Sequence, residues 1–303
     1  MKKDTILITG SSGFLGLWLR KKLNNDKYNI FLTASKNYPE QHIHKLDLTN
    51  YEEINKIINE TKPSIIYHLG AIVDLSRDYN TAIKCIDINV KGTLNLLKSL
   101  KKYTPKKFIL ASTEEVYGNG PVPFKESQIP HPPSAYSISK IAAEDFCSIY
   151  AQELNFKLII FRIATMYGPE NPLKRFIPQT IIKALNNENI PLNSGLKKRD
   201  YIYVEDVANA FNDILATELK NQIEIFNLGY GQSHTLKYLV QKVIELTKSS
   251  SNILYNSFPD RTLEAEEWLV DIDKALTLLS WKPQTNLDEG LAKTIKYFRA
   301  NLI

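Results

Sequence analysis

The sequence predicts an α/β fold built on a doubly wound parallel sheet. Strand and helix signals alternate through the first 165 residues, and the predicted strands are continuous apolar runs such as 64–69. A glycine-rich turn joins the first strand to the first helix. Continuous apolar strands are typical of a parallel sheet that helices cover on both faces, and the alternation indicates the doubly wound arrangement.

The elements of this first part are located by apolar runs and by helical spacing of apolar residues. Strands are expected at 6–8, at 28–34, just before 46, and at 64–69, 107–111 and 157–163. Helices are expected directly after the glycine turn and at 51–60, 82–103 and 134–154.

After Gly168-Pro169 the pattern loosens, and prolines and asparagines become frequent through 169–195. A strand and a helix return at 199–215, followed by a strand at 223–228 and helices at 236–247 and 287–300. We expect a larger domain of residues 1–165 and 199–226. A smaller C-terminal α/β lobe of residues 166–198 and 227–303 should pack over the carboxyl ends of the strands, where ligands bind in open α/β sheets.

Composition narrows the classes of function. The 303 residues carry a net charge of +5 with scattered lysines, which favours anionic small molecules over a nucleic acid or a membrane surface as partners. The two cysteines, Cys85 and Cys147, lack metal-ligand spacing and lie in helical segments, so we expect buried thiols, no metal and a cytoplasmic location. The first apolar run is far too short for a signal or membrane segment.

The glycine turn is the first candidate site. Gly10, Gly13 and Gly16 follow the first apolar strand with the spacing G-x-x-G-x-x-G and precede a helix signal. Glycines let the backbone turn sharply and approach a ligand, and the N-terminus of the helix attracts a pyrophosphate. The alternative is an ordinary glycine-rich turn between a strand and a helix.

A second candidate lies at the start of the helix expected at 134–154. Tyr136 and Lys140 are four residues apart and share one helix face, and Ser134 is suited to cap the helix. A neighbouring ammonium favours the phenolate, so this tyrosine can act as an acid or base toward a sugar or alcohol hydroxyl. The alternative is an exposed tyrosine beside a solvated lysine.

A third candidate follows the strand expected at 107–111. Thr113 lies at its carboxyl end, where a hydroxyl can bond a reacting oxygen and position it against Tyr136. Glu114 and Glu115 come next as a pair of carboxylates. They are either an additional acid and base or solvated loop charges.

Taken together, these stretches resemble the extended short-chain dehydrogenase/reductase family, which comprises nucleotide-sugar epimerases, dehydratases and ketoreductases on a Rossmann fold. The likeness covers nearly the whole chain and rests on the order of the motifs. They are Gly10-x-x-Gly13-Phe14-x-Gly16, Asp47-Leu48, His68-Leu69-Gly70-Ala71, Asn89-Val90-x-Gly92-Thr93, Ser112 to Gly118, Tyr136-x-x-x-Lys140, Arg162, Tyr167-Gly168-Pro169, Arg199-Asp200-x-x-x-Val204-x-Asp206-Val207 and Trp281-Lys282-Pro283.

The resemblance implies a role for each matching residue. It implies catalysis by Thr113, Tyr136 and Lys140, and substrate binding by Thr165, Arg199 and Arg261, the two arginines on the nucleotide diphosphate. The implied cofactor-binding residues are Gly10, Ser12, Gly13, Phe14, Leu15 and Gly16 around the pyrophosphate, Asp47 and Leu48 beside the adenine, Leu69, Gly70 and Ala71 along the groove, Asn89 as its support, and Tyr136 and Lys140 toward the nicotinamide ribose. Ser35 and Lys36 are expected near the adenosine ribose, where they depart from the family pattern.

Departures from the family pattern bear on the cofactor and the reaction. NAD-preferring members carry an acid where this chain has Ser35-Lys36, so NADP(H) is expected to be favoured over NAD(H). Many relatives have Asn where this chain has Thr165, so sugar or diphosphate contacts are expected to differ. Dehydratases show Thr-Asp-Glu where this chain has Thr113-Glu114-Glu115.

The resemblance implies hydride transfer at a hexose carbon, usually C4, of a nucleotide sugar. A 4-keto-sugar-nucleotide reductase is the first expectation, because the absence of a ribose-binding acid favours an exchangeable NADP(H). A 4-epimerase, a 4,6-dehydratase that uses Glu114 and Glu115, and a non-catalytic dinucleotide-binding regulator stay open as alternatives.

A homodimer is also expected. The helices predicted at 82–103 and 134–154 carry apolar residues beyond one core-facing stripe, and in relatives two such helices per subunit form the interface. These residues are Ile86, Leu94, Leu97, Ile141, Phe146 and Ile149. The alternative is that both faces of each helix pack within one chain.

Overall fold

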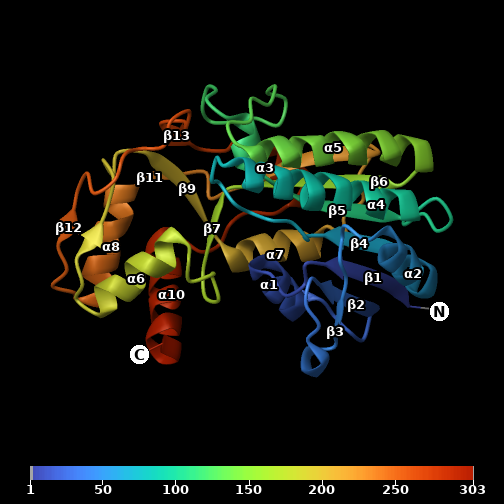
Figure 1. Cartoon of the computed structure of the whole chain (residues 1–303), viewed down its shortest axis with the longest axis horizontal. Helices are drawn as coiled ribbons and strands as arrows, with labels where there is room; N and C mark the ends of the chain where they lie inside the picture. Colours follow the sequence, from blue (N-terminus) through green and yellow to red (C-terminus); the bar gives the residue numbers. More distant parts are fainter. Residues whose placement is uncertain (1–2, 303) are drawn as a thin grey trace. The chain divides into compact units, whose positions relative to one another are not determined.

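The computed structural model describes residues 3–302 (Figure 1), which divide into two compact units. The first unit consists of residues 3–117, 129–162 and 211–226. The second consists of residues 118–128, 163–210 and 227–302. Within residues 3–302, no helix combines the length and the apolar character needed to cross a membrane.

A seven-stranded sheet forms the centre of the first unit, with the strand order β10-β6-β5-β4-β1-β2-β3. Strand β1 pairs in parallel with β2 and β4, β2 with β3, and β4 with β5. Six strands thus follow the doubly wound order 3-2-1-4-5-6, which confirms the predicted fold class. The strands are β1 (Asp4–Thr9), β2 (Tyr28–Ala34), β3 (Ile43–Lys45), β4 (Ile65–His68), β5 (Lys107–Thr113), β6 (Lys157–Ile163) and β10 (Ile223–Leu228).

Helices cover both faces of this sheet, because successive residues of a buried strand point to opposite sides. On one face, Leu7 packs into a buried cluster with residues of α2 (Tyr51–Thr61), α4 (Gly92–Ser99) and α5 (Ala135–Leu154). On the other, Tyr67 donates a 2.6 Å hydrogen bond to the carbonyl of Phe211 on α7 (Val204–Asp213). Helix α1 (Phe14–Lys22) buries Leu15 and Leu19.

The single helix predicted over 82–103 is wrong. The chain forms α3 (Tyr79–Cys85), then the π-helical segment η2 (Ile86–Lys91), then α4, which ends at Ser99. A π-turn inserts an extra residue and rotates the following face, so the apolar spacing read from the sequence does not hold across it. The residues expected at a dimer interface differ in exposure. Leu97 is fully buried in the core, whereas Ile86 and Ile149 are exposed.

The second unit is built around β9 (Lys198–Tyr203). This strand pairs in parallel with β7 (Thr165–Tyr167) and β13 (Glu267–Trp268) and antiparallel with β11 (Ser233–Thr235). Helices α6 (Phe176–Leu185), α8 (Leu236–Thr247) and α10 (Leu287–Leu302) pack on one another around a separate apolar core. The remaining elements are β8 (Ile190–Pro191), which pairs with β12 (Ile253–Leu254), and α9 (Asp273–Leu279).

The boundaries between the units differ from those expected. Residues 199–210 were expected in the first domain, but β9 pairs with the strands of the second unit. Residues 118–128 also join the second unit, because the Phe124 amide donates to Leu269 at 2.7 Å and its carbonyl accepts from Asp271 at 2.8 Å. Such pairings join residues far apart in the sequence, which local patterns do not reveal.

Candidate active site

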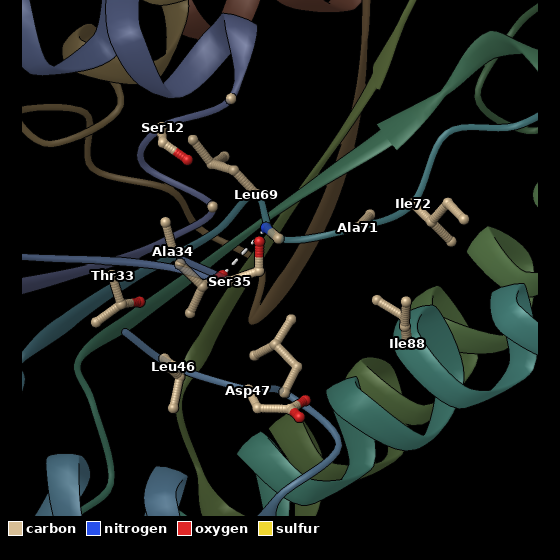
Figure 2. Close-up of a pocket in the computed structure, with 15 residues that line it drawn as sticks. Ser12, Thr33, Ala34, Ser35, Leu46, Asp47, Leu69, Ala71, Ile72 and Ile88 are labelled. Carbon is tan, nitrogen blue, oxygen red and sulfur yellow. Dashed lines mark hydrogen bonds between the residues drawn. The ribbon is translucent and has the colours of Figure 1, made fainter. Parts of the chain in front are cut away.

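A cavity of about 380 Å³ lies in the first unit, at the carboxyl ends of β1, β2 and β4 (Figure 2). Parallel strands end at the same edge of a sheet, so segments far apart in the sequence meet here. Its wall is formed by Thr9, Gly10, Ser12, Gly13, Thr33, Ala34, Ser35, Leu46, Asp47, Leu48, Leu69, Gly70, Ala71, Ile72 and Ile88.

The glycine turn forms one wall of this cavity. Gly10 has φ +70°, and a Cβ atom there would lie 2.7 Å from the Cα of Gly70. A Cβ on Gly16 would lie 2.6 Å from the Gly10 carbonyl oxygen. Helix α1 begins at Phe14 with Gly13 as its N-cap, so its positive end faces the turn. The turn therefore has the close packing and the polarity that suit a bound pyrophosphate.

A chain of buried hydrogen bonds fixes the wall next to this turn, where Thr9 and Gly70 lie. Thr93 donates its hydroxyl proton to the Asn89 carbonyl at 2.6 Å, so it accepts from His68 Nε2 at 2.9 Å. His68 Nδ1 must then accept from Thr9, 2.8 Å away, and Thr9 in turn accepts the Gly70 amide at 3.1 Å. Burial, with a smaller effect of Lys140, lowers the pKa of His68 from 6.5 to about 3, so the imidazole is neutral.

Asn89 holds one cavity-lining residue, Ile72, through hydrogen bonds to its backbone. Its side-chain oxygen accepts the Ile72 amide at 2.8 Å, and its nitrogen donates to the Ile72 carbonyl at 3.0 Å and to Ser139 at 2.9 Å. Asn89 is buried and does not itself line the cavity, whereas Ile72 does. It therefore joins the cavity wall to α5, one residue before Lys140.

The residues expected to do chemistry lie on β5 and α5 of the same unit. Thr113 ends β5, and Tyr136 and Lys140 occupy successive turns of α5. Ser134 caps α5 by accepting the Ser137 amide at 3.1 Å. Burial lowers the pKa of the Lys140 ammonium from 10.5 to about 8, although Glu144 raises it in part. Lys140 is thus a buried cation on the same helix face as a buried phenol.

The two glutamates after Thr113 lie in the short helical turn η3 (Glu114–Tyr117). The Glu115 carboxylate accepts the Ser134 hydroxyl at 2.5 Å, and its amide donates to Thr113 Oγ1 at 3.2 Å. Glu114 is buried. Glu115 therefore links the end of β5 to the start of α5.

A buried ion pair, to which the sequence assigned no role, lies deeper in the unit. Arg162 on β6 donates to both carboxylate oxygens of Glu144 on α5. Its Nη2 and Nε lie 2.7 Å and 3.2 Å from Oε2, and its Nε lies 3.3 Å from Oε1. The Ser112 hydroxyl donates to the same carboxylate. Although burial lowers the pKa of Arg162, its bonds to Glu144 raise it above the ordinary value. The signal available in the sequence is the spacing of Glu144, four residues after Lys140.

The structure brings most of the predicted cofactor residues together. Those that line the cavity are Gly10, Ser12, Gly13, Ser35, Asp47, Leu48, Leu69, Gly70 and Ala71. Those outside its lining are Phe14, Leu15, Gly16, Lys36, Asn89, Tyr136 and Lys140. Lining residues that the sequence did not indicate are Thr9, Thr33, Ala34, Leu46, Ile72 and Ile88.

The predicted substrate residues lie in the second unit. Thr165 begins β7, Arg199 lies on β9, and Arg261 is exposed in the segment between β12 and β13. The Arg199 guanidinium is bonded to Glu264 and lies 5.2 Å from the centre of the Trp268 ring. Among residues 3–302, no group of three or more His, Cys, Asp or Glu side chains is arranged to hold a metal ion.

Comparison with known proteins identifies the family. The model of the family described as "NAD dependent epimerase/dehydratase family" matches residues 6–229. The chain belongs to this family. It is 31% identical, over 99% of its length and 74% of the relative's, to UDP-glucuronic acid decarboxylase 1 of Danio rerio. It is 28% identical to dTDP-4-dehydro-6-deoxyglucose reductase of Escherichia coli over 98% of each chain.

The solved UDP-glucose 4-epimerase of Thermotoga maritima, determined with UDP-glucose, is 28% identical and superposes with a TM-score of 0.90 over 99% of this chain and 100% of the other. Family membership establishes an enzyme of the nucleotide-sugar epimerase, dehydratase, decarboxylase and reductase group. The cavity fits the dinucleotide for which the family is named, since Gly10 packs so closely against the Gly70 backbone that only a residue without a Cβ fits the turn, and apolar residues such as Leu48 and Leu69 offer surfaces for flat rings.

Proposed function

We propose that this family member is a 4-keto-sugar-nucleotide reductase that prefers NADP(H). The observation that carries the proposal is the end of β2, where Ser35 lines the cavity and Lys36 follows it, both exposed. A carboxylate in this position would bind the ribose diol of NAD and repel a 2′-phosphate. Ser35 and Lys36 supply a hydroxyl and a positive charge instead.

The strength of the Lys36 contact sets the size of the preference. Hydrogen bonds to charged groups contribute about 1.5–3 kcal/mol, and exposure to solvent reduces this. About 1.4 kcal/mol corresponds to a factor of ten in affinity. NADP(H) is therefore expected to bind more tightly than NAD(H) by up to about tenfold for each 1.4 kcal/mol that the Lys36 contact contributes. An exchangeable reduced cofactor suits a reductase better than an epimerase, which regenerates its cofactor within each turnover.

The chemistry requires only three side chains. The dinucleotide supplies the hydride that adds to C4 of the keto sugar. Tyr136 donates its phenolic proton to the carbonyl oxygen, so the ketone becomes an alcohol, and the phenolate that remains is stabilised by the Lys140 ammonium. Thr113 donates a hydrogen bond to the same oxygen and orients it toward Tyr136.

The position of Glu115 favours the reductase over the dehydratase. A 4,6-dehydratase eliminates water and needs a further acid and base. Glu115 already accepts the hydroxyl of the Ser134 helix cap at 2.5 Å, which supports a role in holding α5. A 4-epimerase remains the second candidate, favoured by the likeness to the epimerase of Thermotoga maritima.

The proposed substrate is a nucleoside-diphosphate sugar, with Arg199 and Arg261 of the second unit on the diphosphate and Thr165 near the sugar. We also propose a homodimer formed through α3, η2 and α5, because Ile83, Ile86 and Ile149 are exposed there. Light scattering at micromolar concentration tests the dimer, and a monomer mass would reject it.

The reaction is tested by following absorbance at 340 nm with a dTDP-4-keto-6-deoxyhexose and either reduced cofactor. Consumption of NADPH with formation of the 4-hydroxy sugar supports the reductase. If instead the purified protein retains NAD and interconverts 4-epimers without net change at 340 nm, the epimerase replaces it.

A further inference from the structure

Two hydrogen-bonded links join β5 and η3 to α5, and the residues of the proposed chemistry lie between them. At one end, Glu115 of η3 accepts the hydroxyl of Ser134, the cap of α5. At the other, Ser112 of β5 donates to Glu144 of α5. Thr113 lies between Ser112 and Glu115 in the chain, and Tyr136 and Lys140 lie between Ser134 and Glu144.

The Ser112 link is built on a rigid, buried base. Glu144 and Arg162 have side chains only 3% and 4% exposed, and their contact is two-pronged, with 2.7 Å and 3.2 Å bonds to one carboxylate oxygen. The Arg162 guanidinium also lies 4.9 Å from the centre of the Tyr117 ring, which belongs to η3. Strand β6 therefore holds Glu144 in one orientation, and Glu144 holds Ser112.

Residues 136, 140 and 144 are spaced by four and occupy one face of α5. A rotation or shift of the helix at Glu144 therefore moves Lys140 and Tyr136 together. At the other end of this hydrogen bond, Thr113 directly follows Ser112 on β5. The bond between Ser112 and Glu144 thus sets the spacing between the Thr113 hydroxyl and the Tyr136–Lys140 pair.

We infer that Ser112, Glu144 and Arg162 form a positioning unit that holds Thr113 in register with Tyr136 and Lys140. This inference rests on the roles proposed above for those three residues. None of the positioning residues needs to touch substrate or cofactor. Their effect is on the geometry of the reacting groups, to which rates are sensitive, since a displacement of about 1 Å can cost about 10² in rate.

The decisive variant is Ser112→Ala, which deletes one hydroxyl and leaves the Glu144–Arg162 pair intact. We expect kcat to fall by about 10- to 100-fold, while KM for the sugar nucleotide and the dissociation constant of the reduced cofactor stay within about twofold. Ser112→Thr restores the hydroxyl and should recover most of kcat. If Ser112 contributed only to folding, Ser112→Ala would lower the unfolding temperature but would not lower kcat at an unchanged KM.

Ser148→Ala is the matched control. Ser148 also lies on α5 and also donates to Glu144, but at 2.8 Å to its backbone carbonyl rather than to its carboxylate. We expect this variant to keep the kcat of the wild type. If Ser112→Ala does not fold, Ser112→Cys keeps the size of the side chain and weakens the donor, and it should give an intermediate kcat.

A second readout does not depend on the sugar. The titration of Tyr136, measured as the 295 nm difference between each protein and its Tyr136→Phe derivative, should move to higher pH in Ser112→Ala, because a displaced Lys140 stabilises the phenolate less. If the wild type reduces no keto sugar, the proposed reaction fails while this titration still tests the positioning unit. Equal kcat and equal titrations in wild type, Ser112→Ala and Ser112→Cys would overturn the inference.

Discussion

Each unit contains an arginine bonded to a glutamate, and the two pairs differ in how they are held. Arg162 and Glu144 are 4% and 3% exposed, lie on β6 and α5, and share the carboxylate with Ser112. Arg199 and Glu264 are each 15% exposed, and Glu264 belongs to the irregular segment between β12 and β13. The first pair is a fixed part of the core. In the second, the arginine is partly accessible, as its proposed contact with the diphosphate of the substrate requires.

The largest expected effect is on turnover, at Tyr136, which the Arg162–Glu144 pair is proposed to hold in position. Tyr136→Phe removes the proposed proton donor and should lower turnover by about 10²–10⁴, the usual contribution of a positioned acid or base. Cofactor affinity, measured by fluorescence titration, should be retained because Tyr136 does not line the cavity. Turnover near that of the wild type would remove Tyr136 from the mechanism.

Breaking the buried pair tests its role in the core. Glu144→Gln leaves the Arg162 guanidinium without a counter-charge inside the protein, which typically costs about 3–5 kcal/mol of unfolding free energy. Urea unfolding of the wild type and the variant at pH 7 measures the difference. A loss below about 1 kcal/mol would mean that the pair is no more important than a surface contact.

Lys140 offers a contrasting buried charge. Its pKa is lowered from 10.5 to about 8 by burial, so between these values the folded state binds fewer protons than the unfolded chain. The ammonium thus lowers stability below pH 8, and stability should rise as pH increases from 8 toward 10.5. At about 1.36 kcal/mol per pKa unit, Lys140→Met should stabilise the fold by about 3 kcal/mol at pH 7.

Urea unfolding of Lys140→Met and wild type across pH 7 to 10 checks this. The gap in stability should narrow as pH rises, and turnover should be lost at every pH. If Lys140→Met is less stable than the wild type at pH 7, interactions with the surrounding groups fully offset the cost of burying the Lys140 ammonium.

The smallest effect on stability is expected at the second pair. Glu264→Gln removes a partly exposed partner of Arg199, and exposed ion pairs contribute about 1 kcal/mol or less. The same variant should bind a nucleoside diphosphate at least as well as the wild type, because the Arg199 charge is no longer neutralised. Calorimetric titration with UDP and dTDP measures this, and weaker binding would show that Glu264 itself holds the nucleotide.

The sequence predicted the parts of this molecule that local pattern controls. The apolar strands gave the parallel sheet, and the G-x-x-G-x-x-G spacing located the turn where Gly10 has φ +70°. The positions of Thr113, Tyr136 and Lys140 on β5 and α5 followed from an apolar strand end and a capped helix with four-residue spacing.

The features that escaped prediction depend on distant partners. The π-helical η2 places Asn89 against Ile72 and Ser139, and nothing in residues 86–91 alone indicates those bonds. The sequence indicated no role for Glu144, and only the fold brings Arg162 to it. The transfer of 118–128 to the second unit likewise rests on Phe124 pairing with residues about 145 positions away.

The central claim, a preference for NADP(H), is tested most directly by titrating NADPH and NADH into the wild type, Lys36→Ala and Lys27→Ala, with nucleotide fluorescence as the readout. Lys27 is an exposed lysine next to the opposite end of β2 and serves as the matched control. We predict that the wild type binds NADPH more tightly than NADH, that Lys36→Ala loses this preference without weaker NADH binding, and that Lys27→Ala keeps it. Tighter binding of NADH by the wild type, or unchanged selectivity in Lys36→Ala, would contradict the account and favour the epimerase.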